Sequence, residues 1–166
     1  MTNSPKPAQQ PGTAEFLHRL ISTTAPNATI LVRLMVGAVF LSEGIQKFLF
    51  PDKLGVGRFA KIGIPSPEVL APFVGFVEIT CGLMLLAGFL TRLAAAPMII
   101  VMLVAITTTK LFTLPVSGFW VMAHEARTDW SMILGSVFLL IVGGGAWSVD
   151  AFWASRRIAR SRQQPL

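Results

Sequence analysis

The chain has few of the residues that carry redox chemistry. It has a single cysteine, Cys81, so it cannot form an intramolecular disulfide or a CxxC dithiol pair. Its two histidines, His18 and His124, lie outside the apolar segments, which excludes a bis-histidine haem site within a membrane. The chain also has no GxGxxG nucleotide motif and no metal-ligand motif. The sequence therefore does not identify a cofactor. Any electron carrier must be supplied by another molecule.

Charged residues are scarce as well. They make up 13% of the chain against 53% hydrophobic residues, and the mean hydropathy is +0.65, values typical of a membrane protein. The net charge of +6 does not indicate nucleic acid, because four arginines follow the last apolar segment, where basic residues mark the cytoplasmic side of a membrane. These are Arg156, Arg157, Arg160 and Arg162. We expect a lipid bilayer, and no nucleic acid, as the partner.

Four apolar segments predict an all-α fold, an integral membrane four-helix bundle. The expected spans are residues 28–50, 68–90, 93–114 and 130–147, within a membrane domain over residues 28–150. Residues 1–27 are expected to form a polar flexible tail with a short surface helix at 15–22, and residues 151–166 a basic tail. The stretch 51–67 and the stretch LFTLPVSGFWVMAHEARTDW are expected to be loops.

The distribution of basic residues predicts the orientation. Four spans place both termini on one side of the membrane. The arginine-rich tail and Arg92, in the turn between the second and third spans, favour the cytoplasm for that side. We therefore expect a multi-pass protein of the bacterial plasma (inner) membrane with both long loops facing outward.

Glu78 is the main candidate for a functional side chain. It lies near the midpoint of an otherwise apolar span, where an ionisable residue costs roughly 2.5 to 3.5 kcal/mol. Such a residue needs either a charged partner or a functional role. Lys47 and Glu43 are the nearest candidates in the sequence for an interaction with the Glu78 carboxylate. The catalytic candidates are therefore Glu78, Lys47 and Glu43. Alternatively, Glu43 and Lys47, four residues apart, neutralise each other in a structural ion pair.

Small residues accompany these charges. Gly37 and Gly44 share the helical face of Lys47, and Gly75 and Gly82 share that of Glu78. Glycines allow helices in a membrane to approach closely. Arg33, on the same face as Gly37, is expected to be an end anchor that extends toward the interface.

A second ionic group lies near the end of the third span and in the following loop. The ligand-binding candidates there are Lys110, His124, Arg127 and Asp129. The alternative is a solvated segment that caps the fourth helix, with Asp129 near the helix N-terminus. Lys47-Phe-Leu-Phe-Pro51 and Lys110-Leu-Phe-Thr-Leu-Pro115 also form a faint internal repeat, and the element after each carries an acid, Glu78 or Asp129.

The residues resemble the DoxX family of small bacterial four-helix membrane proteins. Three stretches carry the resemblance: RLMVGAVFLSEGIQKF, GIPSPEVLAPFVGFVEITCGLMLLAGFLTRLAA and GGGAWSVDA. The positions that match the family's recurrent ones are Gly37, Gly44, Lys47, Pro65, Glu78, Gly82, Gly88 and Arg92. The family is similar to, and partly named after, the membrane subunit of a thiosulfate:quinone oxidoreductase, so the resemblance implies a redox role with a quinone as ligand.

Three functions remain open at this point. The first is the membrane component of a redox system that handles a quinone or a small sulfur-containing or electrophilic substrate in an outward-facing polar pocket. It would work with a soluble redox enzyme or as a homo-oligomer, and the residues do not decide whether this chain is itself an enzyme. The second is a non-enzymatic small-molecule transporter or membrane-assembly factor, in which Glu78 relays protons or binds a cation. The third is a structural bundle whose charges pair internally.

Overall fold

The chain folds into helices throughout the part that the structure describes. A computed structural model describes residues 25–161, so the surface helix expected at 15–22 lies outside the described residues. The helices are α2 (Thr29–Leu49), α3 (Pro51–Leu54), α4 (Val56–Lys61), α5 (Pro67–Ala87), α6 (Thr91–Ala105), the π-helix η1 (Ile106–Lys110), α7 (Leu111–Ser117), α8 (Phe119–Val142) and α9 (Val149–Ser161). This confirms the predicted all-α fold.

Three helical stretches of the described chain are long and apolar enough to cross a membrane. They are Thr29–Leu49, Pro67–Ala87 and Thr91–Lys110. Only about a third or less of each stretch is buried inside the bundle, and the apolar side chains that remain accessible suit a surrounding of lipid. α8 has a comparable length but carries Glu125, Arg127 and Asp129. A fourth crossing therefore stays a prediction.

The expected boundaries of the fourth long helix are wrong. α8 begins at Phe119, not near Trp130, and ends at Val142, not Trp147. Glycines with positive φ, Gly118 at 83° and Gly143 at 82°, flank it. The second part of the expected loop, residues 119–130, contains no proline or glycine to interrupt a helix, and it forms the first half of α8. Asp129 consequently lies near the middle of this helix and does not cap its N-terminus.

Three smaller differences concern the connections. The expected loop over residues 51–67 contains the short helices α3 and α4. The third long helix continues through η1 and α7 to Ser117, past its expected end at Leu114. The expected basic tail is helical as far as Ser161, in α9.

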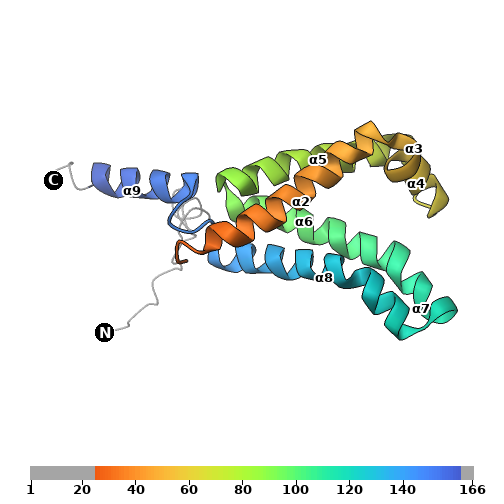
Figure 1. Ribbon diagram of the computed structural model, residues 1–166. Coiled ribbons are helices and arrows are strands. Elements are labelled where there is room, and N and C mark those ends of the chain that lie inside the picture. The colour runs from red at the N-terminus through yellow and green to blue at the C-terminus, as the bar shows by residue number, and fades with distance from the viewer. Residues whose placement is uncertain (1–24, 162–166) are drawn as a thin grey trace, which may run out of the picture.

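The four long helices form two pairs that diverge from a common end. α2 packs mainly on α5, and α6 packs mainly on α8. Figure 1 shows the pairs meeting near α9 and separating toward the opposite end. There α3 and α4 extend the α2/α5 pair, and α7 extends the α6/α8 pair. The end near α9 is called the closed end below, and the opposite end the open end.

Glycines set the close contact within the α2/α5 pair. A Cβ atom added to Gly44 would lie 2.7 Å from the carbonyl oxygen of Gly75, and one added to Gly82 would lie 2.8 Å from the nitrogen of Leu41. Neither distance leaves room for a side chain, so only glycine fits. The close helix approach predicted from the glycine faces is confirmed, and it brings the polar face of α2 against that of α5.

Arg33 joins three segments at the closed end. Its guanidinium donates hydrogen bonds to the carbonyl oxygens of Leu85 at 2.9 Å, Leu86 at 2.7 Å, Gly144 at 3.0 Å and Trp147 at 2.6 Å. These bonds satisfy carbonyls at the C-terminus of α5 and in the connection from α8 to α9, which lack helical partners. Arg33 is 2% exposed, so the expectation of an anchor extending to the interface is wrong.

Asp150 completes the closed end from the start of α9. Its carboxylate accepts hydrogen bonds from the backbone nitrogens of Leu90 at 2.7 Å and Thr91 at 3.0 Å, and from the Thr91 hydroxyl at 2.9 Å. A carboxylate at this position satisfies the free donors at the N-terminus of α6. Gly88 ends α5 with φ of 68°, and a Cβ there would lie 2.6 Å from Arg33 Cζ. The turn between α5 and α6 is thus fixed from both sides.

We expect Arg33→Lys to destabilise the protein by about 2 to 3 kcal/mol, because an ammonium cannot reach four carbonyls on separate segments as a planar guanidinium does. Thermal unfolding in detergent measures the loss. Arg127→Lys is the control, since Arg127 is exposed and its guanidinium bonds a carbonyl of its own helix, and its effect should stay within about 0.5 kcal/mol. Equal unfolding midpoints for both variants would contradict the role of Arg33.

Candidate functional site

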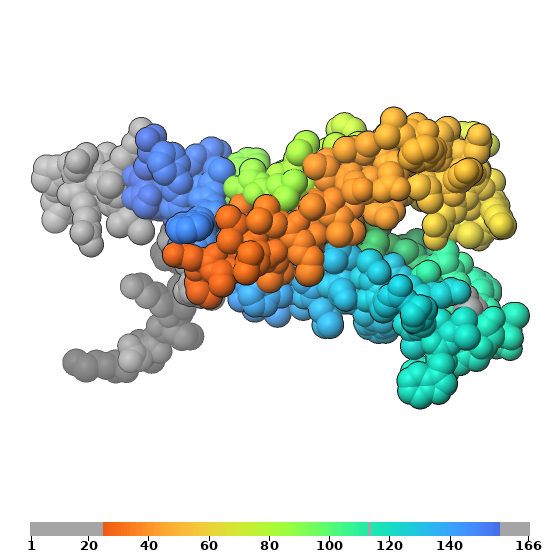
Figure 2. All heavy atoms as spheres, viewed as in Figure 1, coloured from red at the N-terminus to blue at the C-terminus, as the bar shows by residue number. Residues whose placement is uncertain are grey.

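A cavity of about 740 Å³ lies between the two diverging helix pairs. All four long helices line it, and Figure 2 shows the surface hollowed between the α4 and α7 ends of the molecule. Most of its wall is apolar, including Phe40, Met102 and Met132 at the protein core. Seven charged residues also line it: Glu43, Lys47, Arg58, Glu78, Lys110, Glu125 and Asp129.

Lys47 and Glu78 form a buried ion pair on the α2/α5 side of this cavity. Lys47 Nζ lies 2.6 Å from Glu78 Oε2, and their side chains are 11% and 2% exposed. Among the described residues this oxygen has no hydrogen bond of regular geometry, so the attraction is between the charges. Lys47 thus pairs across the helices with Glu78, and not with Glu43 one turn before it on α2. Removing either partner would leave a charge buried in apolar surroundings.

A looser pair lies on the opposite side of the cavity. Lys110 Nζ is 4.0 Å from Asp129 Oδ2, and both side chains are 19% exposed. Each lysine therefore faces the acid carried by the next long helix, as the faint internal repeat suggests. Lys110 ends the π-helix η1, a form that is frequent at functional sites. Within η1 the Thr107 and Thr108 hydroxyls donate hydrogen bonds to the carbonyls of Leu103 and Val104, so the helix backbone already takes up these two donors.

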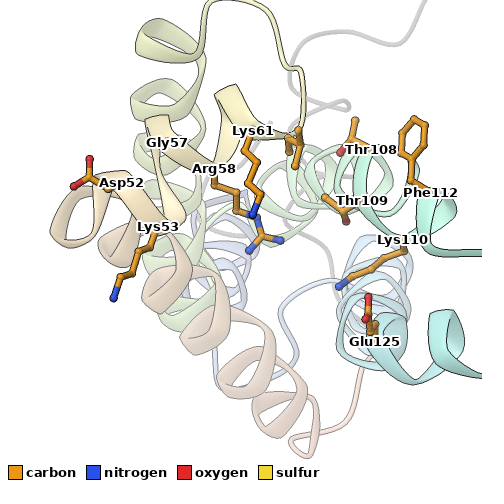
Figure 3. A pocket seen from close by; sticks show the side chains of 11 residues that line it. Asp52, Lys53, Gly57, Arg58, Lys61, Thr108, Thr109, Lys110, Phe112 and Glu125 are labelled. Atoms are coloured by element: carbon orange, nitrogen blue, oxygen red, sulfur yellow. The ribbon is translucent and has the colours of Figure 1, made fainter. Parts of the chain in front are cut away.

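A basic mouth adjoins the cavity at the open end. It has a volume of about 810 Å³. Figure 3 shows Arg58 and Lys61 extending from α4 into the gap, while Lys110 extends toward them from η1. Glu125 lies beside Lys110 in this view, whereas Asp52 and Lys53 point away from the gap. Arg58, Lys110 and Glu125 line both the mouth and the cavity, so the two form one continuous space.

The structure brings together five of the seven candidate residues. Those that line the cavity are Glu43, Lys47, Glu78, Lys110 and Asp129. His124 and Arg127 lie on another face of α8, are exposed, and contact each other through the Arg127 Nη1 bond to the His124 carbonyl at 2.9 Å. These two candidates do not line the cavity, because the helical phase of α8 turns Glu125, Thr128 and Asp129 inward in their place.

Two charged residues of the cavity were missed by the sequence reasoning. Glu125 belongs to the same polar tract as His124, and only the register of α8 selects it. Arg58 sits on α4, in a stretch expected to be a loop, and it lines both the cavity and its mouth. Among the described residues no group of three or more His, Cys, Asp or Glu side chains could hold a metal ion. The chemistry available is hydrogen bonding and proton transfer by lysines and carboxylates beside an apolar wall.

A double-mutant cycle should separate the two ion pairs. For Lys47→Met and Glu78→Gln we expect a coupling energy of about 2 kcal/mol, because the pair is close and buried. For Lys110→Met and Asp129→Asn, at 4.0 Å and more exposed, we expect about 1 kcal/mol or less. Unfolding of the four single and two double variants in detergent gives both values. Additive effects of the Lys47 and Glu78 changes would show that the charges do not stabilise each other.

Comparison with known proteins identifies the family. The DoxX family model matches residues 28–113. An uncharacterized membrane protein of Mycobacterium tuberculosis is 52% identical over 147 residues, which is 85% of this chain and 90% of that protein. A Bacillus subtilis protein named "Putative oxidoreductase CatD" is 27% identical over 124 residues, 75% of this chain and 85% of that protein. No solved structure matches. The family match covers more than half of the chain and the mycobacterial relative nearly all of its own length, and we conclude that this chain belongs to the DoxX family.

Proposed function

We propose that the protein is the membrane component of a quinone-linked redox system and that its cavity binds the quinone headgroup. The observation that carries this proposal is the buried Lys47–Glu78 pair, at 2.6 Å, inside a largely apolar cavity between transmembrane helices. An apolar wall with a few converging polar groups is typical of small-ligand sites. The name of the Bacillus subtilis relative, which is 27% identical to this chain, also supports a role in an oxidoreductase system.

The charged side chains suit both forms of a quinone. Its carbonyl oxygens accept hydrogen bonds from the ammonium groups of Lys47 and Lys110, and the hydroxyls of the quinol donate to Glu78 and Asp129. Reduction to the quinol needs two electrons and two protons. The protons pass through these side chains, and a redox partner protein supplies the electrons, because the sequence carries no nucleotide motif and no cysteine pair. We assign the proton transfer to Glu78, because it is the more deeply buried of these two carboxylates, with 2% of its side chain exposed against 19% for Asp129.

The membrane arrangement that we propose has α8 as a fourth crossing, in the bacterial plasma membrane. The closed end, with Arg92 and the arginines of α9 near it, then faces the cytoplasm, where basic residues collect. The cavity opens toward the outer side. A redox partner would accordingly approach from that side, over the mouth formed by α4 and α7.

Cysteine labelling tests this orientation. In a Cys81→Ser background, we expect a cysteine at Ser117, exposed in α7 at the open end, to react with a membrane-impermeant thiol reagent in intact cells. One at Ser155, exposed in α9, should react only after the cells are lysed. If Ser155→Cys is labelled in intact cells and Ser117→Cys is not, the orientation is the reverse. If both are labelled equally, α8 does not cross the membrane between them and the number of crossings is not even.

Quinone binding tests the function itself. Protein purified in mild detergent should yield a quinone on solvent extraction, seen by its absorbance. A short-chain quinone should also quench the intrinsic tryptophan fluorescence, with Kd raised about 100-fold in the Lys47→Met, Lys110→Met double variant, since each lost charged hydrogen bond weakens binding by about 1.5 kcal/mol and about 1.4 kcal/mol is tenfold. Unchanged affinity in the double variant would remove both lysines from the site.

Two further variants sharpen that result. Glu78→Gln, nearly isosteric, should accumulate in the membrane and bind the quinone but fail to complement a deletion strain, because an amide cannot carry the proton. Arg127→Gln, which faces away from the cavity, is the matched control and should behave as the wild type. Full complementation by Glu78→Gln at matched protein level would contradict the assigned role.

A further inference from the structure

The cavity has two open sides of opposite character. On the α2/α8 side the exposed lining residues are polar: Glu43, Glu125 and Thr128. On the α5/α6 side the lining consists of apolar side chains from both helices. These are Leu70, Phe73, Val74, Pro97, Ile100 and Val104. One side of the cavity is thus suited to water, and the other to hydrocarbon.

The apolar side is open to the exterior of the bundle. Phe73, Ile100 and Val104 line the cavity and yet are 60%, 61% and 46% exposed. All three belong to stretches apolar enough to cross a membrane, Pro67–Ala87 and Thr91–Lys110. The opening between α5 and α6 therefore faces the acyl chains of the bilayer and not an aqueous phase.

The geometry of the hairpin explains this opening. α5 and α6 are held together at the closed end, where Asp150 and Arg33 fix the turn after Gly88. Beyond that point the two helices separate, as Figure 1 shows. Each also contains a proline, Pro72 or Pro97, which removes one backbone hydrogen bond and bends a helix. The gap is thus a consequence of where the hairpin is fixed.

The charges inside the cavity restrict the headgroup that it can hold. Three cationic side chains and four carboxylates line it, so there is no surplus of positive charge for an anion. The closest pair, Lys47 with Glu78, already neutralises itself. A neutral headgroup with carbonyl or hydroxyl groups can accept from the lysines and donate to the carboxylates. A carboxylate or phosphate headgroup would leave uncompensated negative charge.

We propose that the α5/α6 side is a lateral portal, through which a neutral, long-tailed lipid-soluble molecule reaches the Lys47–Glu78 pair from within the bilayer. Its tail stays between α5 and α6, against Phe73, Ile100 and Val104. The proposal rests on the function proposed above, since it takes the cavity to be the ligand site. It adds the route, the side and the requirement for a tail and an uncharged head.

Photolabelling of the full chain in liposomes tests the portal. Two probes carry the same long alkyl chain with a diazirine near its end, one with a benzoquinone head and one with a carboxylate head. The quinone probe should label peptides of α5 and α6. Ile100→Trp and Val104→Trp, which place a large ring in the opening at exposed positions, should each lower this labelling about tenfold, the effect of a steric cost near 1.4 kcal/mol.

Control variants assign the effect to the portal. Ile141→Trp, at a site that is 67% exposed and outside the cavity lining, should label as the wild type does. Leu134→Trp, at a second site on α8 that is 66% exposed and outside the cavity lining, should also leave labelling by the tailed probe unchanged. A tail-less, water-soluble quinone should bind Ile100→Trp as tightly as it binds the wild type.

The outcomes distinguish the portal from the binding function. If the tail-less quinone binds but Ile100→Trp and Val104→Trp label normally, the portal is wrong and the binding site stands. Equal labelling by the carboxylate probe would overturn the neutral-headgroup requirement. If neither the tailed probe nor the tail-less quinone binds the wild type, both proposals fail.

Discussion

The shape of this protein depends on one buried guanidinium. Arg33 on α2 bonds four carbonyl oxygens that belong to the end of α5 and to the connection after α8, so it joins the α2/α5 pair to the α6/α8 pair at a single place. Asp150 fixes the start of α6 at the same end. Because the two pairs are held there and their axes are not parallel, they separate with distance from it. The cavity is the space that this one-ended attachment leaves.

The charges in the cavity follow the same division into pairs. Lys47 and Glu78 come from α2 and α5, while Lys110 and Asp129 come from η1 and α8, so each ion pair forms within one helix pair. Neither pair bridges the gap, and the cavity can therefore widen or narrow without breaking an ion pair. Burial makes the first pair costly to separate, whereas the second is at 4.0 Å and more accessible. A ligand that needs a hydrogen-bond donor would therefore displace Lys110 from Asp129 at a lower cost in free energy than Lys47 from Glu78.

Much of this could be predicted from the sequence where the signal is local. The heptad spacing of Gly37 and Gly44 and of Gly75 and Gly82 predicted which faces of α2 and α5 meet, and the contact of Lys47 with Glu78 follows from it. The role of Arg33 could not be predicted from the sequence, because its acceptors are backbone carbonyls at helix ends. Every residue has a backbone carbonyl, so the residue types do not show which ones accept. The tract around His124 was misread for a related reason. Its polarity is the same in a loop and in a helix, and only the start of α8 at Phe119 fixes which side chains face inward.

The two open sides of the cavity suit different molecules, and each side is formed by one helix from each pair. In the function that we propose, a proton needs a polar path, and the polar residues Glu43, Glu125 and Thr128 line the cavity between α2 and α8. A lipid-soluble ligand needs an apolar path, and we propose that it is the opening between α5 and α6, two stretches apolar enough to cross a membrane. The paths come from opposite sides of the cavity and meet at the Lys47–Glu78 pair. Proton transfer between water and a membrane-dissolved molecule requires a junction of this kind, in which neither reactant has to cross the other's phase.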